Sequence, residues 1–388
     1  MKIAMFTDSY YPAVDGVVVS LTTTSRELKR RGHDVVVFAP EPLKGSVGDL
    51  PDRVVWLPAY AFKQYEGYRN ALFPSAVVSL VRKERPDIIH SHGISFAGVQ
   101  ALLASRNTGI PNVLTYHTML TEAAEHYAPP ILPINVMVRL GWIYQRNFMK
   151  RPHAVITPTE AIKVELQGHR VAARRWEVVP TGVDCARFSP TVSGKDVRKR
   201  HGVEGSRVIL TVGRISKEKN IELLLRGFST LSKKEGDLRL MVAGTGPAAG
   251  DYAETVRQMG LENRVIFTGF IPDSELPAYY AACDAFAISS KFETQGIVAL
   301  EAMASGKPVA AINSAALGEV IKDGTNGYLF DDDPESCAKA LGDAMSDADG
   351  VSGEARKTAE GLSLEKCTGR LIGLYEEISA QTNSSSRL

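Results

Sequence analysis

The chain has 388 residues, of which 44% are hydrophobic and 23% are charged, and its formal net charge is +1. This length favours two or three domains, each large enough for its own core, and the composition is that of a globular protein. The near-neutral balance excludes a strongly basic protein, and we expect no nucleic-acid partner. Residues 1–190 carry 22 Lys+Arg against 16 Asp+Glu (+6), and the remainder carries 23 against 28 (−5). Either the first half faces an anionic surface, or the two surfaces differ by chance.

Cysteine usage and hydropathy indicate the compartment. The four cysteines, Cys185, Cys283, Cys337 and Cys367, lack metal or redox spacing, which predicts a reducing compartment without disulfides. The N-terminal MKIAMFTDSYYP is typical of a strand rather than a signal peptide. No segment approaches the roughly 18 uncharged apolar residues of a membrane span. We therefore expect a cytoplasmic protein, either free or peripheral on the inner face of the cell membrane.

Short runs rich in β-branched residues alternate with longer amphipathic stretches along the whole chain. The predicted strands of the first half are KIAMFT, DVVVFA, RVVWLP, DIIHSH, NVLTYH, HAVITP and WEVVP, and those of the second half are RVILTVG, LRLMVAG, RVIFTG, DAFAIS and PVAAIN. Strands alternating with helices predict parallel sheets joined by right-handed crossovers. The predicted fold class is therefore α/β, with two doubly wound, Rossmann-like domains that bind ligands at the carboxyl ends of their strands.

A break near residue 185 separates the two predicted domains. There PTGVDCARFSPTVSGKD interrupts the alternation with glycine, prolines and polar residues. We predict an N-terminal domain over 1–185, a C-terminal domain over 186–365 and a C-terminal segment over 366–388. LEKCTGRLIGLYEEIS, which starts two residues before that segment at Leu364, has helical spacing, and the final SAQTNSSSRL is typical of a disordered tail.

Gly16 is the first candidate binding residue along the chain. It follows the predicted strand KIAMFTD and the loop SYYPAVD, and it precedes a helix expected from about Val17. A glycine there lets a ligand approach the backbone closely, and a helix N-terminus favours a phosphate. An ordinary turn explains the glycine without any ligand. No G-x-G-x-x-G fingerprint of nicotinamide or flavin binding is present at this turn.

His117 and the segment after it come next. His117 ends the predicted strand NVLTYH, where a lone histidine has either a structural role or a role beside a ligand. Residues 129–151, PPILPINVMVRLGWIYQRNFMKR, combine Trp142, Tyr144 and Phe148 with four basic residues. Such a helix suits an anionic membrane surface, but it can equally pack on its own sheet with the basic residues outward.

TVGRISKEKN, residues 211–220, carries Arg214 and Lys219 from the first strand of the second half into the next helix. An Arg fork and a Lys point charge at the end of a parallel strand would together neutralise a diphosphate. The alternative is a solvated basic turn, since Lys217 is there too.

FETQGIVALEAMASGKPV, from Phe292, surrounds a second predicted strand-to-helix turn. The strand DAFAIS precedes it, and a helix is expected to begin near Gly296. Free amides at Ile297 and Val298 could bind phosphate, and Glu301 could accept hydrogen bonds from a vicinal diol such as ribose. Glu293, in the loop, could hold a sugar hydroxyl.

Together these segments resemble the signatures of retaining glycosyltransferases of family four, which have the GT-B fold. The resemblance rests on TDSYYPAVDGV, VPTGVDCARFSP, GRISKEKN and ETQGIVALEAMASGKPV, and it runs in the expected order from Met1 to about residue 340. It implies two Rossmann-like domains facing each other across a cleft, an N-terminal domain that binds the acceptor and a C-terminal domain that binds the nucleotide sugar. The implied catalytic residues are His117, Arg214, Lys219 and Glu293, and the implied donor-binding residues are Gly16, Gly296, Ile297, Val298 and Glu301.

The same resemblance implies a role for each residue. Glu293 would hold hydroxyls of the transferred sugar, with His117 nearby, and Glu301 would hold the ribose. Arg214 and Lys219 would hold the diphosphate, with Gly16 against it and the amides of residues 296–298 at the phosphate. The implied donor is a UDP- or GDP-linked hexose that reacts with retention of configuration. No cofactor and no metal are expected, because no Asp-x-Asp lies at a credible site, and we favour a same-face displacement assisted by the leaving phosphate.

The acceptor is the remaining question. ETQG, VDGVVVSL and YHTM resemble diacylglycerol glucosyltransferases and related lipid glycosyltransferases, which implies a membrane lipid acceptor. Three alternatives stay open: the same transfer to a sugar phosphate or inositol phosphate, a non-catalytic two-domain protein that binds sugar nucleotides, and an epimerase acting on a nucleotide sugar.

Overall fold

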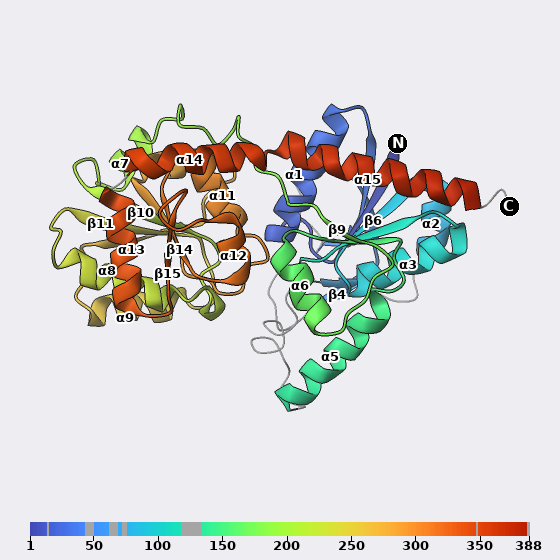
Figure 1. Ribbon diagram of the computed structural model, residues 1–388, viewed down its shortest axis with the longest axis horizontal. Helices are drawn as coiled ribbons and strands as arrows, with labels where there is room; N and C mark the ends of the chain where they lie inside the picture. Colours follow the sequence, from blue (N-terminus) through green and yellow to red (C-terminus); the bar gives the residue numbers. More distant parts are fainter. Residues whose placement is uncertain are drawn as a thin grey trace. The chain divides into compact units, whose positions relative to one another are not determined.

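The computed structural model describes residues 1–13, 15–42, 50–61, 69–71, 76–117, 133–346 and 348–385. These divide into two compact units, one formed by Met1–Gly182 with the chain from Leu364 onward and the other by Val183–Ser363. Each unit holds one parallel sheet with helices packed around it (Figure 1). The first boundary falls after Gly182, near the break at about residue 185, and the second returns the chain to the first unit at Leu364.

The first unit contains a seven-stranded sheet in the order β3-β2-β1-β6-β7-β8-β9, with every neighbouring pair parallel. Its central strands are runs of buried residues, as expected where both faces of a parallel sheet are covered. The strands are β1 (Lys2–Thr7), β2 (Asp34–Pro40), β3 (Arg53–Leu57), β6 (Ile88–His92), β7 (Asn112–Thr115), β8 (Ala154–Thr157) and β9 (Trp176–Val178). A separate antiparallel pair consists of β4 (Ala59–Ala61) and β5 (Arg69–Ala71).

Six described helices belong to the first unit, and the last comes from the far end of the chain. They are α1 (Gly16–Arg30), α2 (Val77–Glu84), α3 (Phe96–Thr108), α5 (Ile134–Phe148), α6 (Glu160–Gly168) and α15 (Leu364–Ser385). The predicted disordered tail is wrong for the described residues, because α15 continues to Ser385. One face of α15 is buried in the core beside α1, through Leu371, Leu374, Tyr375 and Ile378. Because the helix is anchored in this way, each further residue adds one backbone hydrogen bond without a new nucleation cost.

The second unit contains a six-stranded parallel sheet in the order β12-β11-β10-β13-β14-β15. Its strands are β10 (Arg207–Val212), β11 (Leu238–Ala243), β12 (Val265–Gly269), β13 (Ala285–Ile288), β14 (Val309–Ile312) and β15 (Tyr328–Phe330). Its helices are α7 (Lys195–Arg200), the 3-10 turn η1 (Lys217–Lys219), α8 (Ile221–Ser232), α9 (Ala249–Gln258), α10 (Leu276–Ala282), α11 (Ile297–Ala304), α12 (Ala315–Val320), α13 (Pro334–Ser346) and α14 (Ala348–Gly361). All twelve predicted strands are confirmed; β4, β5 and β15, three residues each, were not predicted.

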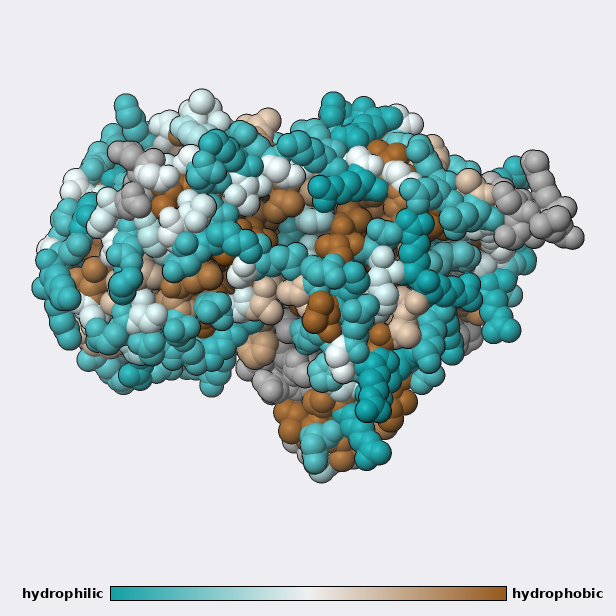
Figure 2. All heavy atoms as spheres, viewed as in Figure 1, coloured by the Kyte–Doolittle hydropathy of each residue, from teal (hydrophilic) through white to brown (hydrophobic). Residues whose placement is uncertain are grey.

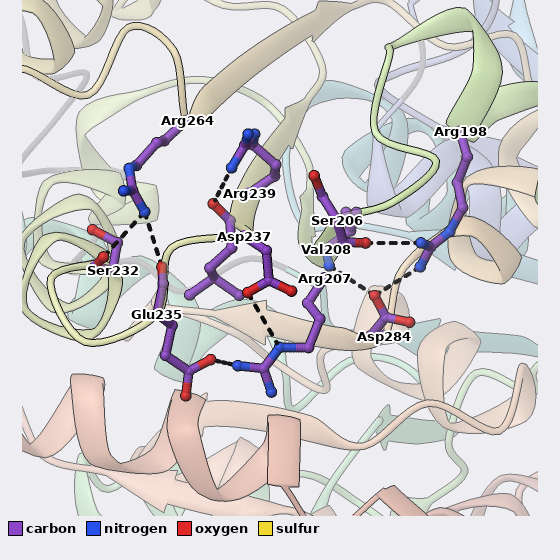
Figure 3. Close-up of polar contacts among 11 residues, drawn as sticks. Arg198, Ser206, Arg207, Val208, Ser232, Glu235, Asp237, Arg239, Arg264 and Asp284 are labelled. Carbon is purple, nitrogen blue, oxygen red and sulfur yellow. Dashed lines mark hydrogen bonds and ion pairs between the residues drawn. The ribbon is translucent and has the colours of Figure 1, made fainter.

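Charged side chains pair with one another at the amino ends of the strands in the second sheet (Figure 3). Asp284, just before β13, accepts hydrogen bonds of 2.7 Å from the backbone N–H of Val208 and from Arg198. Arg207, the first residue of β10, forms an ion pair with Glu235. These contacts tie the strand starts together, and the segments predicted to bind the donor lie at the opposite, carboxyl end of the same strands.

Candidate functional site

The order of strands marks one place in the second unit where ligands bind in folds of this kind. From β10 the chain moves through β11 and β12 to one edge of the sheet, and then from β13 through β14 and β15 to the other edge. The connections after β10 and β13 therefore lead toward opposite edges of the sheet, and folds of this class bind ligands at the carboxyl ends of two such strands. Both predicted donor-binding segments follow these strands.

Lys219 and Glu293 meet at this switch point. Lys219 ends the turn η1 after β10, and Glu293 lies in the loop after β13. The Lys219 Nζ atom lies 2.7 Å from Glu293 Oε1, and the hydroxyl of Ser289 donates a hydrogen bond of 2.9 Å to the carbonyl of Lys219. The Glu293 side chain is 16% exposed and that of Lys219 is 32% exposed. The structure thus brings together two residues that are 74 positions apart in sequence, and both remain accessible to a ligand.

Arg214 lies exposed in the loop between β10 and η1. Lys217 is also exposed, on the same turn as Lys219. The structure therefore distinguishes the two lysines, since only Lys219 forms an ion pair with Glu293 among the ion pairs of the described residues.

Gly296 is the N-cap residue immediately before α11, so the helix starts near Gly296 as the sequence predicts. Its φ of +80° lies in the left-handed region, and a Cβ atom built on it would lie 2.5 Å from a methyl carbon of Leu317. Both facts favour glycine whether or not a ligand approaches. No side chain caps the helix, so the amides of Ile297 and Val298 at its first turn lack a side-chain acceptor of the usual kind.

Glu301 lies one turn into α11 and is only 6% exposed. The hydroxyl of Tyr280, on α10, donates a hydrogen bond of 2.7 Å to Glu301 Oε2. Burial raises the pKa of Glu301 to about 7, although the hydrogen bond from Tyr280 and the charge of Arg187 oppose the shift. A carboxyl group of this kind changes protonation near neutral pH, and both of its oxygens act purely as acceptors for ligand hydroxyls only when it is ionised.

The first unit has its own switch point between β1 and β6, and histidines gather beside it. His92, the last residue of β6, is in register with Thr7 of β1 and Thr115 of β7. His117 follows β7 by two residues, and its Nε2 lies 3.1 Å from His92 Nδ1. Burial lowers the pKa of His117 to about 4, against a smaller opposite effect of Asp15. His117 is therefore neutral at physiological pH and can either donate or accept a hydrogen bond.

Two carboxylates organise the helix starts near these histidines. Asp15, before α1, accepts hydrogen bonds of 2.9 Å from the amides of Val17 and Val18, so the helix begins at Gly16, one residue before the expected start. A Cβ atom on Gly16 would meet nothing within 4 Å, so packing within the structure does not require a glycine there. Asp8, after β1, accepts from the Ala97 amide at 2.8 Å, and burial raises its pKa to about 6.

The helix α5 corresponds to the described part of the 129–151 segment, of which residues 129–132 lie outside the described residues. The suggested surface aromatics are largely wrong. Trp142 is 6% exposed and stacks on His169, and Phe148 is buried, whereas Tyr144 is exposed and donates to the carbonyl of Ile94. Arg146 also faces inward and donates to the carbonyl of His169 at 2.8 Å.

A different set of side chains faces outward from α5. Figure 2 shows apolar side chains gathered at the end of this helix that projects from the first unit. They are Ile134, Val136, Leu140 and Ile143, with Leu140 53% exposed. Arg139 is exposed on the same helix, exposed Lys150 and Arg151 follow its C-terminal end, and residues 133–151 contain no Asp or Glu.

Sequence reasoning missed His90, His92, Asp8, Asp15 and Tyr280. The signal for the two histidines was present in HSH, because residues two apart in a strand point to the same face of the sheet. The roles of Asp8 and Tyr280 depend on contacts with α3 and α11, and these were not predictable from local patterns.

No group of three or more His, Cys, Asp or Glu side chains within the described ranges could hold a metal ion. The helices in the part of the chain that the structure describes are all too short or too polar to cross a membrane.

Two parallel Rossmann-like sheets, each with polar residues at its switch point, are the architecture of the GT-B fold. Residues 14–187 match the model described as Glycosyltransferase Family 4, and residues 194–360 match Glycosyl transferases group 1. The chain is 34% identical over 343 residues to alpha-monoglucosyldiacylglycerol synthase of Streptococcus pneumoniae, covering 85% of this chain and 75% of that protein. On this basis the chain belongs to the family 4 glycosyltransferases.

Other similar proteins differ in what their names specify. GDP-mannose-dependent alpha-mannosyltransferase of Mycolicibacterium smegmatis is 27% identical over 385 residues, 97% of this chain and 98% of that protein. The crystal structure of Anabaena Alr3699/HepE in complex with UDP is similar in fold, with a TM-score of 0.76, 21% identity, and coverage of 97% of this chain and 100% of that chain. The printed names of a sequence relative and of a protein of similar fold thus specify different nucleotides, GDP and UDP.

Proposed function

We propose that this glycosyltransferase moves a hexose from a UDP- or GDP-sugar to a membrane lipid, with retention of configuration. The observation that carries the donor half of the proposal is the contact between Lys219 and Glu293 at the switch point of the second unit. A cation beside an acceptor of sugar hydroxyls, at the carboxyl ends of β10 and β13, matches the diphosphate and the adjoining sugar of a nucleotide sugar.

In the proposed donor site, Lys219 and Arg214 bind the diphosphate and Glu293 accepts hydrogen bonds from hydroxyls of the transferred sugar. The amides of residues 296–298 at the start of α11 add donors for a phosphate oxygen. Glu301, once ionised, accepts from the ribose. The Gly16 turn offers backbone to the diphosphate, and His117 positions the sugar.

The proposed chemistry uses these groups to stabilise charge. As the glycosidic bond to the diphosphate breaks, negative charge grows on the leaving phosphate, and Lys219, Arg214 and the α11 amides stabilise it. No step requires a metal or a cofactor in this proposal. The acceptor hydroxyl attacks the face from which the diphosphate leaves, and the leaving phosphate takes the hydroxyl proton. A trapped covalent glycosyl-enzyme would contradict this mechanism.

The surface of α5 supports the lipid acceptor. Four side chains of α5 present apolar surface to solvent: Ile134, Val136, Leu140 and Ile143. The segment 133–151 also exposes basic residues and contains no acidic residue. This combination binds an anionic bilayer surface, through apolar burial and electrostatic attraction together. The similarity to a synthase of a glucosylated diacylglycerol supports the same class of acceptor.

A panel of donors and acceptors tests the proposal. The protein is incubated with UDP-glucose or GDP-mannose, each with diacylglycerol in vesicles, with inositol phosphate or without acceptor, and nucleotide release and products are measured. Transfer to the lipid is expected. Transfer only to the soluble acceptor would replace the lipid proposal, an epimerised donor without transfer would indicate an epimerase, and binding without turnover would indicate a non-catalytic protein.

Vesicle binding tests the membrane surface separately. We expect Leu140→Ser with Ile143→Ser to weaken binding to anionic vesicles about tenfold or more, because two half-exposed apolar side chains no longer enter the bilayer. Val164→Ser, at an exposed apolar residue on α6 of the same unit, is the matched control. Equal binding by both variants and the wild type would contradict a docking role for α5.

A further inference from the structure

Three histidine rings stand in a row where β6 and β7 end. His90 and His92 are on β6, with ring centroids 4.2 Å apart, and His117 lies beyond His92. The ring planes of His92 and His117 are nearly parallel, at 10°, with centroids 5.3 Å apart. Together with the 3.1 Å distance between His92 Nδ1 and His117 Nε2, this is the arrangement of two imidazoles joined edge to edge by one N–H···N hydrogen bond.

The row is anchored at its far end by a helix from the other end of the chain. His90 Nδ1 lies 2.6 Å from the hydroxyl of Tyr375 on α15, and His90 Nε2 lies 2.7 Å from the hydroxyl of Thr115. Both ring nitrogens of His90 are therefore engaged. His92 is fixed in turn, because its backbone pairs with both β1 and β7 and its ring packs against that of His90.

Based on this geometry, we propose that His92 is a positioning residue for His117: it fixes which nitrogen of His117 carries the proton and which way the ring points. The proposal rests on the proposed role of His117 in transfer. His117 lies beyond the end of β7, whereas His92 belongs to a central strand, so the rigid residue orients the less constrained one. With Nε2 engaged by His92, Nδ1 is the nitrogen of His117 left for a ligand.

A small cavity lined by His92 explains how its second ring nitrogen, Nε2, can find a hydrogen-bond partner. His92 Nε2 is buried and has no hydrogen-bond partner among the described residues. His92 lines a cavity of about 30 Å³ together with the polar side chains of Ser20, Thr24, Thr115 and Thr181. One ordered water needs roughly 10–15 Å³ and two or more polar partners, so the cavity has room for one or two waters and is too small for a sugar. Hydration there would give His92 Nε2 a hydrogen-bond partner.

Two substitutions separate the nitrogens of His92. The amide of Asn can take the place of Nδ1, and that of Gln can reach the place of Nε2, so His92→Asn preserves the contact with His117 and His92→Gln loses it. We expect His92→Asn to retain kcat within about threefold of the wild type. We expect His92→Gln to lower kcat about tenfold or more, because it loses one orienting hydrogen bond. The KM for the donor should be nearly unchanged in both variants.

Tyr375→Phe is the control within the same row. It removes the hydroxyl that contacts His90 but touches neither His92 nor His117, so it should lower the melting temperature while kcat stays within about threefold. Equal losses of kcat in His92→Asn and His92→Gln, or a loss in Tyr375→Phe as large as in His92→Gln, would overturn the proposal.

Nitrogen NMR of ¹⁵N-histidine-labelled protein without substrate provides a readout that does not depend on activity. We expect one tautomer of His117 in the wild type and in His92→Asn, and a mixture or the other tautomer in His92→Gln. The same His117 signals in all three proteins would reject His92 as the positioning residue. Absence of any turnover in the wild type would reject the proposed function instead, and the NMR comparison would still decide the role of His92.

Discussion

Replacing Lys219 by Ala tests the donor site most directly. The substitution removes the ammonium that lies 2.7 Å from Glu293, at the switch point between β10 and β13. If the diphosphate of the donor lies against this ammonium, the variant loses one charge–charge interaction in the ground state and more as negative charge grows on the leaving phosphate.

The structure limits the size of the effect. Two unit charges about 4 Å apart interact by about 4 kcal/mol at an effective dielectric constant near 20. Lys219 is 32% exposed and shares its charge with Glu293, so we take half of that value, about 2 kcal/mol, which is a loss of about 30-fold in kcat/KM. The assay is release of UDP or GDP from the donor that the wild type uses, together with calorimetric titration of the free nucleotide diphosphate.

Lys217→Ala is the matched control, because it removes the same charge from an exposed position on the same turn. We expect less than about a twofold change in kcat/KM from that variant. Equal losses in Lys217→Ala and Lys219→Ala would mean that the turn acts only through its overall charge. Unchanged nucleotide affinity and turnover in Lys219→Ala would refute the proposed position of the diphosphate.

Three further outcomes follow from the second unit. Because burial raises the pKa of Glu301 to about 7 from a model-compound value of 4.5, the folded state keeps a proton there that the unfolded state has lost. The free energy of unfolding should thus fall by up to about 3 kcal/mol as the pH rises from 4.5 to about 7, and it should level off above that. Urea titrations at pH 5 and pH 8 should show a smaller fall in Glu301→Gln than in the wild type. An identical fall in both proteins would contradict the raised pKa of Glu301. Gly296→Ala should lower the free energy of unfolding in urea by about 2–4 kcal/mol, because the φ of +80° and the Leu317 methyl both oppose a Cβ atom. A loss below about 1 kcal/mol would contradict this account of Gly296. Asp284→Ala removes the acceptor of Arg198 and of the Val208 amide on β10. It should therefore lower the free energy of unfolding by about 2–3 kcal/mol while the KM for the donor stays unchanged. A raised KM would mean that the two ends of the sheet are coupled.

Most of the secondary structure and the donor segments were predictable from local patterns. A strand buried on both faces reads as a short apolar run, and twelve such runs became strands. The residues after β10 and β13 were identified because parallel strands end in ligand-binding loops, and the switch point between these strands then explains why Lys219 and Glu293 meet.

Prediction failed where a side chain's role depends on a distant partner. The amphipathic pattern of α5 indicated a surface helix, but it did not show which face packs against the protein. In the structure, Trp142 and Arg146 both contact His169, the residue that follows α6. The polar composition of the C-terminus suggested disorder, whereas packing of α15 in the core beside α1 carries the helix to Ser385.

The sequence by itself determined the α/β class, the order of strands and helices along the chain, and the family, because each of these follows from short-range periodicity and from motifs of a few residues. Only the tertiary structure decided that Tyr375 supports His90 from 285 positions away, that Glu301 is buried beneath Tyr280, and that His92 joins His117. Hydrogen bonds and burial of this kind depend on which elements pack together, and a linear pattern carries no record of the partner that lies across the fold.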